Sequence, residues 1–201
     1  MTTSLPEAPN SYTLVLPPGW IRVSLTGTVQ QAVKDLTDRM FRNIPRDDAL
    51  DERRAVADLL GDMVRRAKAG NGLDLYVPVE KIHGRTIAAS FVVGGVMLPD
   101  EVDGMESLAI LGDLAKGGKP VEVDREIGVR TERVQTADLG QDRNVDVDSR
   151  RVDYMFPVPA DGRRWLVVTF STPGAGAPDD QVANALVQLF DAMMTTFRWR
   201  R

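Results

Sequence analysis

The chain has 201 residues, of which 43% are hydrophobic and 27% are charged, and its formal net charge is −4. This composition is typical of a globular domain, and the length is sufficient for a sizeable hydrophobic core. The lack of cysteine excludes disulfides, thiol catalysis and zinc–thiolate or iron–sulfur sites, and the acidic balance gives no global attraction to nucleic acid or anionic lipid.

The N-terminal residues carry no recognisable sorting signal. They lack a basic start and a long apolar run, so we expect neither a signal peptide nor a membrane span, and we expect a cytoplasmic location. Richness in arginine, alanine, valine and aspartate is common in GC-rich bacteria. Residues 1–10 are polar with two prolines and predict a flexible tail, which precedes a single domain over residues 11–201.

The segment after the tail predicts a β-hairpin followed by two helices. "YTLVL" and "WIRVSL" alternate in polarity on either side of "PPG" at residues 17–19. Thr28 begins a capping box, with glutamine three residues later, and apolar residues continue on one helical face until Pro45. A second helix is expected from about residue 47 to Gly70, with acids at its start and basic residues at its end.

The rest of the chain predicts mostly strands. Pro78 indicates that the strand at residues 73–79 is an edge strand or carries a bulge. "DG" at residues 161–162 marks the hairpin between the strands at residues 151–158 and 163–170. A short helix is expected at residues 105–114 and a final helix at residues 180–199. The expected strands lie at residues 73–79, 86–98, 119–124, 127–136, 151–158 and 163–170.

About eight strands and three or four helices result from these patterns, and most of the strands are connected as hairpins. We find no internal repeat and no linker that would divide the chain. The sequence therefore predicts an α+β fold, with a central antiparallel sheet and helices packed on it.

No residues have the spacing of a known catalytic or metal site. The single histidine, His83, lies in an expected turn, where a solvated side chain is the favoured interpretation. "GAGAP" precedes the last helix, but Asp179 and Asp180 occupy the place where an anion would bind. Residues 142–153 lack the glycine and glutamate of a calcium loop. We therefore expect no catalytic residue, no metal and no cofactor.

The C-terminal "FRWRR" combines basic and aromatic residues, a pattern also found where proteins bind nucleic acid. Phe197 continues the apolar face of the last helix, and the arginines stand where cations favour a helix end. The end of a core helix is therefore the favoured interpretation, and we expect no nucleic-acid binding. The alternative is a partner-binding patch that includes Arg198, Trp199 and Arg200.

Two segments resemble the Mog1/PsbP-like superfamily. "YTLVLPPGW" is similar to that family's opening strand and P-x-G-W turn, and "WLVVTFSTP" followed by "LVQLFDAMMTTFRW" is similar to its last strand and final helix. The resemblance covers about a quarter of the chain. It implies a single sandwich with helices on both sides of an antiparallel sheet, and mostly non-enzymatic binding of protein partners. The family has no shared catalytic set that would transfer to this chain.

Three functions from different classes remain open. The leading hypothesis is a non-catalytic cytoplasmic protein-interaction module, such as an assembly factor or chaperone of a bacterial secretion or envelope system. The alternative is a small-molecule-binding protein or a hydrolase with a pocket between sheet and helices, for which His83 and Arg85 are the first candidates. The third is self-association as a homodimer through edge strands such as residues 73–79 and the apolar Val92 and Val93.

Overall fold

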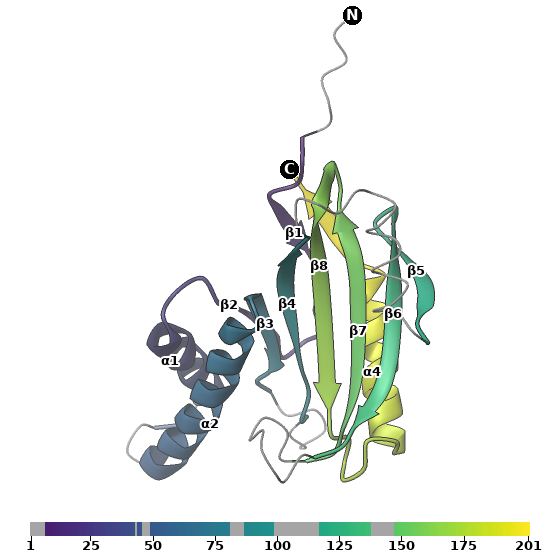
Figure 1. Cartoon of the computed structure of the whole chain (residues 1–201). Helices are drawn as coiled ribbons and strands as arrows, with labels where there is room; N and C mark the ends of the chain where they lie inside the picture. Colours follow the sequence, from purple (N-terminus) through teal and green to yellow (C-terminus); the bar gives the residue numbers. More distant parts are fainter. Residues whose placement is uncertain (1–6, 43, 46–48, 81–86, 99–116, 138–146) are drawn as a thin grey trace, which may run out of the picture.

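The computed structural model describes residues 7–42, 44–45, 49–80, 87–98, 117–137 and 147–201. These residues form an α+β fold in which three helices pack against a large antiparallel sheet (Figure 1). In chain order the elements are β1 (Ser11–Thr13), β2 (Trp20–Ser24), α1 (Val29–Met40), α2 (Leu50–Ala69), β3 (Gly72–Pro78), β4 (Ser90–Met97), β5 (Lys119–Val123), β6 (Glu126–Gln135), β7 (Ser149–Val158), β8 (Asp161–Thr172), α4 (Gln181–Met194) and β9 (Arg198–Arg200).

The seven-stranded sheet has the order β2-β3-β4-β8-β7-β6-β5, and all neighbouring strands are antiparallel. The predicted hairpin β7–β8 is confirmed, and the Asp161 carboxylate accepts hydrogen bonds from the backbone N–H groups of Arg163 and Arg164 just beyond the turn. A separate two-stranded ribbon pairs β1 with β9. The ribbon therefore pairs a strand near the start of the chain with a strand at its end, and the C-terminus lies beside β1 in Figure 1.

Helix α4 covers one face of the central strands and forms the larger hydrophobic core with them. Successive side chains of β7 and β8 point to opposite faces of the sheet, so every second side chain points toward α4. Most of the buried apolar residues of both strands lie on this face. Asp180 caps the helix because its carboxylate accepts a hydrogen bond from the N–H of Ala183 at 2.7 Å. The largest fully buried side chains of this core are Phe91, Phe156, Phe170, Phe190 and Phe197.

Helices α1 and α2 lie on the opposite face, over the β2–β3 end of the sheet (Figure 1). Leu75 of β3 points into this second core, whereas its neighbour Tyr76 points into the core beneath α4. The predicted cap of α1 is confirmed, since the Thr28 hydroxyl accepts a hydrogen bond from the N–H of Gln31. The sheet therefore carries helices on both faces, with the α1–α2 pair near one edge.

The predicted hairpin between "YTLVL" and "WIRVSL" is wrong. The first segment forms β1, which pairs with β9, whereas the second forms β2, which pairs with β3. Tyr12 of β1 stacks on Phe197 with 5.2 Å between ring centroids. This contact buries Tyr12 against residues from the far end of the chain, which a local turn signal does not reveal.

The final helix is shorter than predicted. It ends at Met194, where the hydroxyls of Thr195 and Thr196 donate hydrogen bonds to carbonyls of the last turn. The chain then reverses, so that Phe197 is fully buried outside the helix and the following residues form β9. The arginines are consequently not a helix end, because they belong to a strand.

Strand β3 is an internal strand, which corrects the prediction of an edge. It lies between β2 and β4, and its irregular register occurs between Gly72 and Asp74 rather than at Pro78. Val93 is almost fully buried. Self-association through this strand is therefore contradicted by the sheet order.

The expected short helix at residues 105–114 lies outside the described residues. Among the described helices, none combines the length and apolar character that crossing a bilayer requires.

Candidate functional site

The predicted C-terminal residues lie on the β1–β9 ribbon. The backbone N–H of Trp199 donates a 2.7 Å hydrogen bond to Asp124, and its ring contacts Phe156 and Phe197 edge to face. Arg198 and Arg200 flank it and are exposed. The structure thus brings these three predicted residues together, with Trp199 half-buried between the ribbon and the core.

The other two predicted residues, His83 and Arg85, lie outside the described residues.

Tyr12 of the ribbon forms a partly buried network with Asp74 and Arg22 of the sheet. Asp74 accepts two hydrogen bonds from Arg22, each at 2.8 Å, and one from the hydroxyl of Tyr12 at 2.5 Å. The Tyr12 oxygen in turn accepts a hydrogen bond from Tyr76. Burial and the neighbouring Tyr76 and Asp74 raise the pKa of Tyr12 far above its ordinary value, so this phenol stays protonated at neutral pH.

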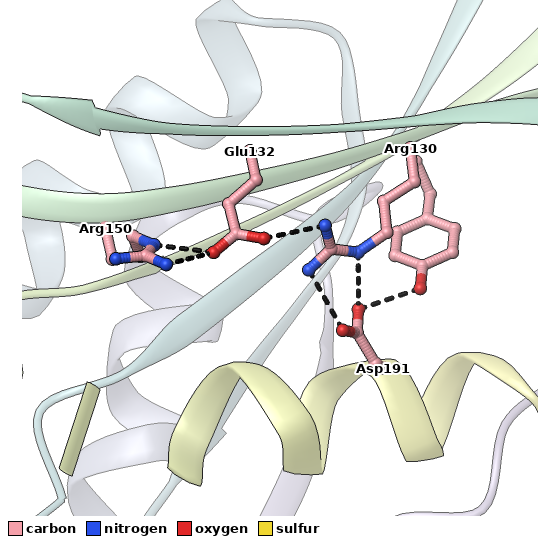
Figure 2. A network of polar contacts seen from close by, with 5 residues as sticks. Arg130, Glu132, Arg150 and Asp191 are labelled. Carbon is pink, nitrogen blue, oxygen red and sulfur yellow. Dashed lines mark hydrogen bonds and ion pairs between the residues drawn. The ribbon is translucent and has the colours of Figure 1, made fainter. Parts of the chain in front are cut away.

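A second network connects α4 to the sheet (Figure 2). Arg130 of β6 donates two 2.9 Å hydrogen bonds to Asp191 of α4 and one to Glu132, which also accepts from Arg150. The hydroxyl of Tyr154 donates to the same Asp191 at 2.8 Å. Burial and this hydrogen bond raise the pKa of Tyr154.

Both networks hold elements together and are poorly suited to proton transfer. A general base must be able to accept a proton near neutral pH, but Tyr12 and Tyr154 are protonated donors with raised pKa values. Their partners, Asp74 and Asp191, each accept two bonds from an arginine as well as one from the tyrosine. The two networks therefore hold β1 and α4 in place on the sheet.

The Glu132 carboxylate allows a test of the network through pH. Burial alone would raise the pKa of Glu132, but hydrogen bonds from Arg130 and Arg150 outweigh burial and hold this pKa below its usual value. A lowered folded-state pKa stabilises the fold above the unfolded pKa, and this stabilisation is lost as pH falls through the folded pKa. Glu132→Gln should therefore lower the free energy of unfolding by about 1 kcal/mol at neutral pH and by less near pH 3.

Urea unfolding at the two pH values measures this difference. Glu122→Gln on the exposed part of β5 is the matched control and should change little at either pH. A Glu132→Gln effect of equal size at both pH values would contradict the assigned role of the carboxylate.

A groove of about 1050 Å³ lies between α1 and α2. Apolar and small side chains from both helices lie along it, among them Val29, Val33 and Ala57. Among the described residues, its charged lining consists of four cations and two anions, which are Lys34, Arg53, Arg54, Arg65, Asp38 and Asp58. The groove is therefore locally positive on a chain whose net charge is −4.

The cations of the groove differ in how firmly they are held. Arg53 is only 18% exposed, lies over the Phe41 ring and donates to the carbonyl of Phe41. Arg54 and Arg65 are 78% and 59% exposed, and among the described residues their ion-pair partners, Asp51 and Asp62, lie in the same helix. Ion pairs this exposed are weak, so these two guanidinium groups are available to an incoming acidic partner.

Sequence reasoning did not find this groove. It identified one apolar face on each helix, and it interpreted the charged residues of the second helix only by their order along the helix. The sequence does contain one indication of the groove. On α2, a second set of residues recurs at helical spacing and lines the groove: Leu50, Arg54, Ala57, Gly61 and Arg65. The angle at which α1 and α2 separate could not be read from either helix alone.

Comparisons with known proteins do not assign the chain. No family model matches it, and no curated protein matches it. Among solved structures, a protein of Bacteroides thetaiotaomicron VPI-5482 aligns with a TM-score of 0.38 and 8% identity over 64% of this chain. The chain spans 38% of that protein's length, and similarity at this level carries no argument about fold or function.

Proposed function

We propose that this protein is a non-catalytic interaction module whose α1–α2 groove binds an acidic, amphipathic helix of a partner protein. The observation that carries the proposal is the groove itself, which combines an apolar floor with an excess of positive charge. Helix-in-groove binding uses the same combination, since apolar anchors give affinity and complementary charges select the partner.

The dimensions of the groove favour a helix over a small molecule. Helix α2 has 20 residues and α1 has 12, which correspond to about 30 Å and 18 Å of groove wall. A helix placed along this wall would set its apolar face against Val29, Val33 and Ala57. Its acidic residues would then face Arg54 and Arg65 at the rim.

The hydrogen bonding within the two described polar networks supports a binding role rather than a catalytic one. Tyr12 and Tyr154 are held protonated, and the carboxylates beside them accept hydrogen bonds from arginines. Within this proposal the fold is a Mog1/PsbP-like sandwich, which the helices on both sheet faces support. The corresponding role is that of a cytoplasmic assembly factor or chaperone of a bacterial secretion or envelope system.

Site-specific photocross-linking tests the proposal in the cell that produces the protein. A benzoylphenylalanine is placed at Ala57, which lines the groove, or at Ala55, which is exposed on the same helix outside the groove. We expect efficient cross-links from Ala57 to peptides with a negative net charge and helical periodicity. Equal cross-linking from both positions, or none from Ala57, would contradict the proposal.

A further inference from the structure

A second, smaller cavity of about 460 Å³ lies between the β1–β9 ribbon and one end of the sheet. Its walls come from seven strands of the sheet and ribbon, which are distant from one another in sequence. For example, β1 and β9 contribute Tyr12 and Trp199, while β4 and β8 contribute Met97 and Trp165. This volume falls within the range of small-molecule sites. The cavity shares no lining residue with the α1–α2 groove.

Exposed apolar side chains gather at this cavity. Among the described residues, three of the exposed large apolar side chains line it: Leu73, Val96 and Met97, which are 40%, 45% and 61% exposed. Isolated apolar residues on a surface are ordinary, but a cluster around a hollow marks a surface that an apolar ligand covers. The cavity therefore offers a place for a hydrocarbon chain or ring.

Two arginines supply the polar end of the same cavity. The side chains of Arg22 and Arg164 are 48% and 44% exposed and belong to its lining. Asp74, the single acidic residue in the described lining, is buried and already bound to Arg22 and Tyr12. Arg164 also pairs with Asp161 beside the cavity, and the described lining itself carries one net positive charge, which favours an anionic head group.

Two indole groups in the walls have no hydrogen-bond acceptor among the described residues. The Nε1 atoms of Trp165 and Trp199 are both buried without a partner in this part of the chain, and Trp165 as a whole is only 8% exposed. Both indole rings line the cavity, so a bound ligand changes the surroundings of their N–H groups. Trp20 also has an unpaired indole N–H but does not line the cavity.

We infer that this cavity binds a small amphipathic carboxylate. The apolar part of the ligand lies against Val96 and Met97, and the carboxylate lies near Arg22 and Arg164. Because β1 and β9 form one wall, occupancy also stabilises the pairing of the two chain ends. This inference is independent of the α1–α2 groove, and its failure would leave the proposed function intact.

The test uses decanoate, with decanol and decylamine as probes that share its chain and differ in head group. Two-dimensional proton–nitrogen NMR resolves the three indole N–H signals of the protein. We expect decanoate to shift the signals of Trp165 and Trp199 while that of Trp20 stays in place. Decylamine should shift none of them, and decanol should bind about tenfold more weakly than decanoate.

Met97→Glu places a carboxylate on the apolar wall at an exposed position, where the fold tolerates it. We expect this variant to lose decanoate binding, whereas Ile127→Glu, at an equally exposed apolar position of β6 outside the cavity, should retain it. The inference is overturned if decanoate shifts none of the indole signals or all three alike. It is also overturned if decylamine binds as well as decanoate, or if Met97→Glu binds decanoate like the unaltered protein.

Discussion

Phe190→Ala should lower the free energy of unfolding by about 3–5 kcal/mol, the largest loss expected for a single substitution in this chain. Phe190 is fully buried at the centre of the core between α4 and the sheet. Its ring centroid lies 4.9 Å from that of Phe170, 5.5 Å from Phe91 and 5.6 Å from Tyr154. Truncation removes all three ring contacts and leaves a cavity that the rigid sheet cannot close.

Urea unfolding followed by circular dichroism measures this loss. Gln188→Ala, at an exposed position of the same helix, is the control and should change the free energy by less than about 0.5 kcal/mol. A loss below about 1 kcal/mol for Phe190→Ala would mean that α4 does not pack on the sheet as described.

Asp74→Ala should lower the free energy of unfolding by about 2–3 kcal/mol. The carboxylate is buried and accepts hydrogen bonds from Arg22 and Tyr12, so its removal leaves the buried Tyr12 hydroxyl without its acceptor. Arg22 is half exposed and regains water, which keeps the loss below that of breaking a fully buried pair. The effect should appear as early loss of the β1–β9 ribbon in hydrogen exchange.

Asp62→Ala provides the comparison for this prediction. Asp62 pairs with Arg65 on the exposed surface of α2, where an ion pair contributes little. If Asp74→Ala destabilised the protein no more than Asp62→Ala, the buried network would have no role in fixing β1 to the sheet.

Elements with strong local signals could be predicted from the sequence. The β7–β8 hairpin combines strict alternation with a turn that Asp161 caps, and α1 begins where the Thr28 side chain can bond to the N–H of Gln31. In both cases the determining interaction lies within a few residues along the chain. The α+β class follows from such elements, because a half-apolar sheet must be covered by amphipathic helices.

Pairings between distant segments could not be predicted. β1 and β9 lie at opposite ends of the chain, and their pairing depends on Tyr12 stacking against Phe197. Phe197 was expected to be buried because it continues the apolar spacing of the last helix, but it is buried from an extended segment after a reversal at Thr195. A periodic pattern shows that a side chain is buried without showing which backbone conformation buries it.

The candidate sites were harder to predict than the fold, because they too depend on contacts between segments that are distant in sequence. Trp199 was recognised as a residue of interest, but its place beside a cavity depends on strands from both ends of the chain. The α1–α2 groove depends on how two helices separate, which their individual periodicities do not specify. Neither hollow has a sequence motif.

The central claim is that the α1–α2 groove, and not the basic C-terminus, binds the partner. The direct measurement is the yield of photocross-links from Ala57 in two charge-reversed backgrounds with the same change in net charge. One background carries Arg54→Glu and Arg65→Glu in the groove, and the other carries Arg200→Glu and Arg201→Glu at the C-terminus. We predict that the groove pair reduces the yield at least about tenfold while the C-terminal pair leaves it unchanged. Loss of the cross-link only in the C-terminal pair would contradict the claim and move the binding site to the β1–β9 ribbon.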